Sequence, residues 1–198
     1  HDLCRRQRQM CIRDRCASLC LVCFTGIIYM INADTVPSLF PLILPVGAIM
    51  GFLMYNLGVL GNQRTVFLGD NGSNALGFMC AWILVYFSSV ENSNFAPVTA
   101  LWFVAIPFFD AVSVMSSRAI KGIMPLRPGR DHLHHKLLDM GLSSNAIYVF
   151  LIFTSALFAA FGYVFNHSFP ESHYISFYAF MILWLCYYFL TSYISKNV

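Results

Sequence analysis

Long apolar runs separated by short polar segments dominate this sequence. Five runs reach the roughly 17 to 25 apolar residues that a membrane-spanning helix needs, and a sixth, the first, is slightly shorter. None of them alternates as a half-buried strand does. The pattern therefore predicts an all-α fold, a polytopic transmembrane helix bundle, with a kink at Pro107 because proline lacks a backbone N–H. About six spans are expected, at residues 16–31, 38–60, 73–90, 97–115, 145–165 and 173–194.

The positive charges beyond position 15 all fall on one side of this predicted membrane. Residues 61–72, 116–144 and the tail from 195 hold all seven of these Lys and Arg residues, and the alternate connecting segments hold none. Because cytosolic loops are enriched in Lys and Arg, this side is assigned to the cytosol, and residues 116–144 form a long cytosolic loop. The composition agrees, since only 11% of the residues are charged, against about 25% in ordinary soluble domains.

The first fifteen residues differ from the rest of the chain. His1 to Arg15 contains five of the twelve Lys and Arg residues and no apolar period. We interpret residues 1–15 as a non-native or disordered N-terminal segment, such as a sequencing or assembly artefact. The alternative is a basic tail that lies on the membrane surface. Residues 16–198 are treated as the transmembrane part.

A first polar cluster, Gly69-Asp70-Asn71-Gly72-Ser73, lies on the cytosolic side where a helix opens. Glycines allow a tight turn, and a helix N-terminus favours anions. Asp70 could hold Mg²⁺, which takes one or two carboxylates together with phosphate oxygens. The alternative is an ordinary helix start, because Asp, Asn and Ser are common capping residues. The residues alone leave both interpretations open.

A second cluster lies in the long cytosolic loop, where residues 127–136 contain three of the six histidines and three of the seven cytosolic cations. Arg130 and its neighbours would suit a phosphate-rich substrate, and histidine adds hydrogen bonds or proton transfer near neutral pH. A basic loop that only follows the positive-inside rule explains the cations but not the histidines, which are His132, His134 and His135. A zinc site is a weaker alternative, because no Cys lies nearby.

Asp110 is the third candidate. A carboxylate at membrane depth is costly, so it faces a bundle interior or a cavity and is functional by default. The structural alternative makes Asp110 a partner of a polar group on a neighbouring helix, or of Arg118 near the interface.

Together these three stretches resemble the polyprenyl-phosphate N-acetylhexosamine-1-phosphate transferases of glycosyltransferase family 4. Residues 66–73 are similar to the family's Gly-Asp-x-Gly-Ser loop, residues 105–110 to its Pro-x-x-Asp helix, and residues 130–135 to its His-x-His-His loop. The resemblance implies catalytic roles for Asp70 and Asp110, with Asp70 as the Mg²⁺ ligand (Mn²⁺ being an option). It implies that the substrate is bound by Asn71, Gly72, Arg130, His132, His134 and His135.

The resemblance also implies the reaction. A polyprenyl phosphate such as undecaprenyl phosphate would attack the sugar-bearing phosphate of a UDP-sugar, with GlcNAc as the favoured N-acetylhexosamine, and release UMP. This chemistry depends on positioning and charge neutralisation. The product would serve synthesis of a cell-envelope polysaccharide such as O-antigen or enterobacterial common antigen. The expected location is the bacterial inner membrane, with no nucleic-acid partner; a homodimer is left open.

The sequence departs from the family pattern at its N-terminal side. The family's further N-terminal helices, its Asp-Asp motif and its Asn-x-x-Asp-Gly-x-Asp-Gly loop are absent from these residues. We therefore expect a truncated sequence that lacks transferase activity by itself. Two competing functions are kept: a transporter or channel subunit with Asp110 in its pathway, and a non-catalytic module whose basic loop binds anionic lipid.

Overall fold

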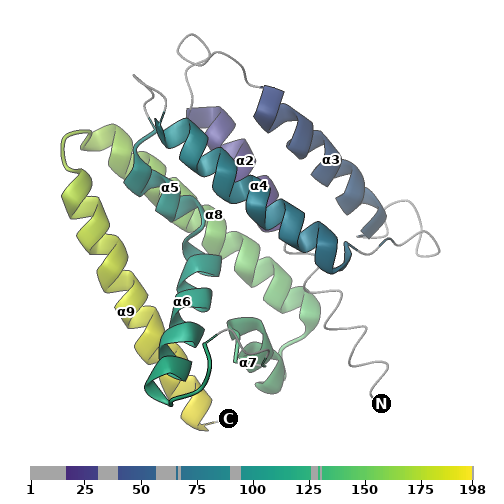
Figure 1. The fold of residues 1–198 in the computed structure, drawn as a ribbon, viewed down its shortest axis with the longest axis vertical. Coiled ribbons are helices and arrows are strands. Elements are labelled where there is room, and N and C mark those ends of the chain that lie inside the picture. Colours follow the sequence, from purple (N-terminus) through teal and green to yellow (C-terminus); the bar gives the residue numbers. More distant parts are fainter. Residues whose placement is uncertain are drawn as a thin grey trace.

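The described part of the chain is entirely helical. The computed structural model describes residues 17–30, 40–56, 66, 68–89, 95–125, 129 and 131–197. The segment 1–15 and Arg130 therefore lie outside the described residues. The all-α prediction is confirmed, and Figure 1 shows the helices as a layered bundle. They are α2 (Ala17–Met30), α3 (Phe40–Asn56), α4 (Gly69–Ser89), α5 (Pro97–Phe103), α6 (Ala105–Ile120), α7 (Leu133–Asp139), α8 (Ser144–Ser168) and α9 (His173–Asn197).

Length and hydropathy identify membrane-spanning candidates among these helices. In the described residues, two helices are long and apolar enough to cross a bilayer, within α8 and α9. The pair α5 and α6 passes the same test together, although it bends by 84°. Shorter apolar helices cover Leu19–Ile28 and Leu42–Asn56. Two to three spans plus these shorter helices are therefore found, and the six-span arrangement remains a prediction.

The fourth predicted span, residues 97–115, is not one kinked helix but two helices. The break falls at Val104, three residues before Pro107. Proline has no N–H to donate to the Phe103 carbonyl, which interrupts the helical hydrogen-bond ladder at this turn. Val104 N instead bonds Leu101 O at 3.2 Å, and Phe108 N restarts the ladder at Val104 O, 2.9 Å away.

The boundaries of the cytosolic loop also need correction. Residues 116–144 were predicted as loop, but α6 continues to Ile120, and α7 forms a second, short helix inside the segment. At the far side of the loop, Ser143 caps α8, its Oγ accepting from Ala146 N at 3.2 Å.

The helix α8 runs through the middle of the bundle and packs against α2, α5, α6, α7 and α9 (Figure 1). It approaches α5 closely where the fully buried Trp102 ring lies against Gly162. A Cβ at Gly162 would overlap the Trp102 side chain, so this crossing requires glycine. Trp102, Phe109 and Phe180 then form an aromatic core between α5, α6 and α9.

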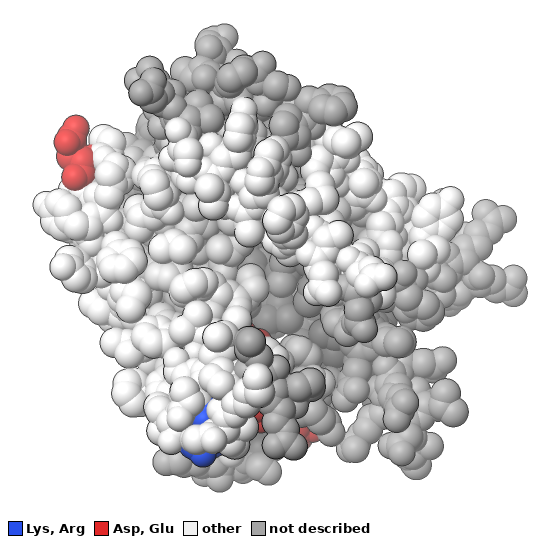
Figure 2. All heavy atoms as spheres, in the orientation of Figure 1, with Lys and Arg blue, Asp and Glu red and all other residues white. Residues whose placement is uncertain are grey.

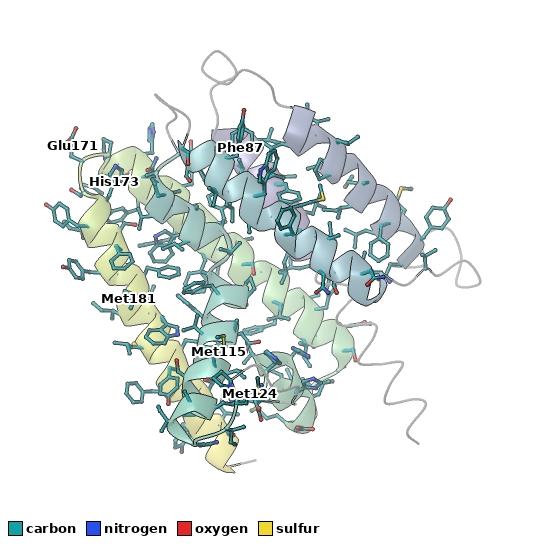
Figure 3. All side chains as sticks on the ribbon, in the orientation of Figure 1. Phe87, Met115, Met124, Glu171, His173 and Met181 are labelled. Atoms are coloured by element: carbon teal, nitrogen blue, oxygen red, sulfur yellow. The ribbon has the colours of Figure 1, made fainter. Side chains whose placement is uncertain are left out.

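Charged atoms lie at both ends of the bundle. On the face shown in Figure 2, the basic atoms appear at the end where α6 and α9 finish, with some acidic atoms nearby, and a separate acidic patch lies at the opposite end. Figure 3 places Glu171, in the turn between α8 and α9, and His173, the first residue of α9, at that opposite end. The polar candidates in α7 lie at the end where α6 and α9 finish (Figure 1).

Candidate functional site

Asp110 is the centre of the candidate site, because three donors from two other segments of the chain, the start of α7 and α9, hydrogen-bond to it. Its Oδ2 accepts from His132 Nδ1 at 2.9 Å. Its Oδ1 accepts from Leu133 N at 2.8 Å and from the Tyr187 hydroxyl, on α9, at 3.1 Å. Asp110 is partly buried. Both carboxylate oxygens are thus satisfied, which makes a carboxylate tolerable at this depth.

The bond to Leu133 N explains how the histidine segment is held. His132 is the N-cap residue of α7, but its own side chain makes no capping bond. The first N–H groups of a helix need an acceptor, and a negative charge is favoured there. Asp110 supplies this acceptor from α6. The start of α7 is therefore capped by a residue 23 positions earlier in the chain.

The Asp110 carboxylate also controls the protonation of His132. The hydrogen bond that His132 donates to Asp110 raises the pKa of His132 above its ordinary value of 6.5, although burial acts in the opposite direction. Because a carboxylate only accepts, Nδ1 of His132 carries a proton. The ring is thereby held in one orientation, with Nε2 left for other interactions, and its charged form is favoured.

His134 differs from His132 in the protonation state that its surroundings favour. The His134 and His135 rings lie 4.2 Å apart between centroids, and the His132 and His134 rings stack at 5.9 Å. Burial, followed by the electrostatic effect of the neighbouring His135, lowers the pKa of His134 to about 4. Near neutral pH this segment therefore presents a neutral imidazole beside one whose cationic form is favoured.

Packing and a second polar contact fix α7 to the bundle. Leu133 is buried with Ile106, Ile147 and Leu151 from α6 and α8. Lys136 Nζ donates to the Thr191 carbonyl oxygen on α9 at 3.0 Å. Neither Tyr187 nor Thr191 was predicted from the sequence, because each is one of many similar residues within an apolar run.

Arg118 pairs with Asp131 and not with Asp110, which corrects one structural alternative for Asp110. Its Nε and Nη2 donate to Asp131 Oδ2 at 2.9 and 2.6 Å, and its Nη1 donates to the Pro125 carbonyl oxygen at 3.1 Å. Arg118 is buried, whereas Asp131 is exposed. A Cβ at Gly129 would overlap the guanidinium, so a larger residue at this position would require the Arg118 side chain to move.

The Gly-Asp-Asn-Gly-Ser segment forms the first turn of α4, four residues earlier than predicted. Gly69 has a φ of 69°, a left-handed conformation that favours glycine. Asn71 is exposed, and a Cβ at Gly72 would overlap the Leu68 side chain. The side chain of Asp70 lies outside what the structure describes, as does Arg130.

Among the described side chains, no group of three His, Cys, Asp or Glu residues comes together in a way that could hold a metal ion. The three neighbouring histidines are therefore not a zinc site within the described part of the chain. Mg²⁺ depends on Asp70, whose role stays a prediction.

Comparison with known proteins gives the family. The model of "Glycosyl transferase family 4" matches residues 15–88. The undecaprenyl-phosphate alpha-N-acetylglucosaminyl 1-phosphate transferase of Escherichia coli strain K12 is 36% identical over 152 residues, which is 77% of this chain and 40% of that protein. The chain belongs to glycosyl transferase family 4. This membership confirms the resemblance drawn from the three polar stretches.

Other members of the family with the same name show similar relations. The protein of Salmonella typhi is 35% identical over 152 residues, 77% of this chain and 40% of its own length. That of Pasteurella multocida strain Pm70 is 36% identical over 141 residues, 71% of this chain and 39% of its own length. The chain thus spans about two fifths of the curated relatives that it matches. No solved structure matches it at a significant level.

Proposed function

We propose that this chain contributes to the active site of a membrane transferase that moves N-acetylhexosamine 1-phosphate, with GlcNAc favoured, from a UDP-sugar to undecaprenyl or another polyprenyl phosphate, releasing UMP. The name of the relatives supports the sugar and the lipid. The observation that carries the proposal is the convergence of α6, α7 and α9 on Asp110, which holds the histidine segment against the bundle.

The protonation states of the histidines suit a diphosphate substrate. His132, whose cationic form is favoured by Asp110, supplies charge to phosphate oxygens, and Nε2 is the atom available to them. His134, which is neutral at pH 7, adds hydrogen bonds without additional charge. In this scheme Asp110 is a positioning residue: it sets the orientation and charge of His132 and does not itself touch the substrate.

Asp70, together with Asn71 and Gly72, is proposed to bind the metal-associated phosphates at the start of α4. The left-handed Gly69 starts this helix, and the following backbone N–H groups favour anions. Mg²⁺ or Mn²⁺ held by Asp70 would neutralise negative charge on the phosphates during transfer. Arg130 is assigned to the same substrate from the sequence.

The proposed membrane arrangement has six spans, with α7 and the start of α4 on the cytosolic side of a bacterial inner membrane. The charge asymmetry in the sequence supports this orientation. It lets a nucleotide-sugar arrive from the cytosol while the polyprenyl chain stays in the bilayer.

The proposal is tested by replacing His132 with alanine in the natural full-length protein and measuring Mg²⁺-dependent UMP release from UDP-GlcNAc and undecaprenyl phosphate. We expect the rate of transfer to fall at least about a hundredfold. This is the lower end of the rate loss usually caused by removing one acid–base or charge-stabilising group. His173→Ala is the matched control, because His173 lies at the opposite end of the bundle (Figure 3). Equal membrane insertion of both variants is checked by protease protection.

Unchanged transfer by His132→Ala would remove the histidine assignment. Loss of transfer in both variants would indicate a general folding defect and contradict the proposed role of this end of the bundle. The transporter alternative is weakened by the structure, because both oxygens of Asp110 already accept hydrogen bonds from the protein.

A further inference from the structure

The helix α9 brings one polar side chain to the surroundings of Asp110. The Tyr187 hydroxyl donates to Asp110 Oδ1 at 3.1 Å, from a position 77 residues later in the chain. The Tyr187 ring also packs against the Phe109 ring, with 5.8 Å between the centroids. A phenylalanine at position 187 would keep this ring contact. What the hydroxyl adds to the packing, within the described residues, is the bond to Asp110.

The three bonds to Asp110 are divided unequally between its two oxygens. Oδ1 accepts both from Leu133 N and from the Tyr187 hydroxyl, whereas Oδ2 accepts from His132 Nδ1. A carboxylate turns easily about its Cβ–Cγ bond, because the energy wells of that torsion are broad. Two donors that reach Oδ1 from different helices restrict this rotation. Oδ2 is thereby directed at His132, the residue assigned to the substrate.

A second contact of α9 reaches the same histidine segment. Lys136, about one turn beyond His132, donates from Nζ to the Thr191 carbonyl oxygen at 3.0 Å. Thr191 follows Tyr187 by four residues, so the two lie on one face of α9. This face therefore contacts α6 through Asp110 and α7 through Lys136.

The position of α9 is itself fixed nearer its other end. Trp102 Nε1 on α5 donates to Ser176 Oγ at 2.9 Å, and both side chains are buried. The buried Phe180 ring packs against the Phe109 ring at 4.7 Å between centroids. The helix also contacts α5, α6 and α7 along its length (Figure 1). A helix held at several points can place a hydroxyl at Asp110 with little freedom of movement.

We propose that Tyr187 is a positioning residue of the transfer reaction: its hydroxyl fixes the Asp110 carboxylate, which in turn orients the His132 ring toward the substrate. Tyr187 does not touch the substrate in this scheme. The inference rests on the proposed function, because that function gives His132 its role in transfer. It adds α9, which contains none of the three polar stretches found in the sequence, to the elements that determine activity.

The test uses Tyr187→Phe in the natural full-length protein, which removes the hydroxyl and keeps the ring. UMP release from UDP-GlcNAc and undecaprenyl phosphate should fall about fivefold, the size expected for one hydrogen bond in a partly buried site. Tyr178→Phe is the matched control. Tyr178 is an exposed tyrosine nearer the start of the same helix, so its hydroxyl should not affect transfer. Unchanged transfer by Tyr187→Phe would overturn the proposal.

Carbon-13 NMR of labelled histidine distinguishes positioning from general stabilisation. Without the hydroxyl the carboxylate turns more freely and its bond to His132 is less populated, so the raised pKa of His132 should fall in Tyr187→Phe. Burial and the Arg118 charge, which lower this pKa, and the Asp131 charge, which raises it, are not altered by the substitution. A rise in the pKa of His132 would overturn the proposal, because the hydroxyl would then merely compete with His132 for the carboxylate.

A double-mutant cycle with Asp110→Ala tests whether Tyr187 acts through Asp110. The double variant should transfer as slowly as Asp110→Ala alone, and a further loss would contradict the inference, since Tyr187 would then act independently of the carboxylate. If His132→Ala abolishes transfer while Tyr187→Phe changes neither transfer nor the His132 pKa, this inference fails and the proposed function stands. Unchanged transfer by His132→Ala would instead remove the proposed function, and with it the role of Tyr187 in transfer.

Discussion

Replacing Asp110 by asparagine removes one negative charge and almost no volume, so it isolates the electrostatic part of the contacts that hold α7. In the original protein Asp110 accepts from His132, Leu133 N and Tyr187. An asparagine Oδ1 can still accept the bonds from Leu133 N and Tyr187. Its amide group, however, places an N–H donor opposite Nδ1 of His132, so the charge-assisted bond from a protonated Nδ1 is lost.

The size of the effect follows from the kind of bond that is lost. A hydrogen bond to a charged group contributes about 1.5–3 kcal/mol. The His132 side chain is 39% exposed, so solvent screening places the loss near the lower end of this range. About 1.5 kcal/mol corresponds to roughly a tenfold decrease in the equilibrium constant for docking of α7. We therefore expect transfer by Asp110→Asn to fall by up to about tenfold, because transfer needs the docked segment.

The sign of the pH effect is also defined. Asp110 raises the pKa of His132, so the contribution of their pair to stability is fully present below the unfolded pKa of about 6.5 and is lost as pH rises through the folded value. In Asp110→Asn the pKa of His132 should fall, because Asp110 no longer raises it while burial and the Arg118 charge still lower it. Transfer that needs cationic His132 should decline at lower pH than in the original protein. Carbon-13 NMR of labelled histidine in nanodiscs measures the pKa, and UMP release gives the pH profile.

A double-mutant cycle with His132→Gln separates this coupling from general damage. If the two residues act as one unit, the double variant should lose about as much transfer as the more damaging single variant. Additive losses, or an unchanged His132 pKa in Asp110→Asn, would refute the reasoning.

Two glycines give further predictions. Gly162→Ala should lower the free energy of unfolding by about 1–3 kcal/mol, because its Cβ would overlap Trp102, and thermal unfolding in detergent measures the loss. Gly129→Ala should displace the Arg118 guanidinium from Asp131 and increase protease cleavage of the cytosolic segment, while a thermal midpoint as low as that of Gly162→Ala would contradict a purely local effect.

Much of the helical framework could be predicted from apolar run length. The runs at 145–165 and 173–194 correspond to α8 and α9, and each helix is only a few residues longer than its run. Pro107 predicted a kink in the fourth run but not its size. A missing N–H interrupts one hydrogen bond, whereas the angle depends on how the two halves pack against α8 and α9, and the local sequence does not contain that information.

The candidate site was only partly predictable for the same reason. Asp110 could be identified from the sequence because a carboxylate is unusual at membrane depth. His132 could be identified because it belongs to a cluster of histidines in a cytosolic loop. Their hydrogen bond joins positions 22 apart, and the Tyr187 hydroxyl reaches Asp110 from 77 positions away. Nothing in a run that already contains several tyrosines distinguishes Tyr187, so only the tertiary arrangement identifies it.

The contacts of Asp110 explain why two distant polar stretches of the chain depend on each other. A carboxylate within an apolar helix is tolerated only where donors reach it, and the first N–H groups of α7 need an acceptor. When α7 docks against α6, the same hydrogen bonds give Asp110 its donors and give the start of α7 its acceptor. The histidines are carried with α7 because His132 is its N-cap residue and His134 and His135 lie in its first turn. The acid therefore determines where the histidine segment sits, and the segment in turn makes the acid tolerable in the bundle.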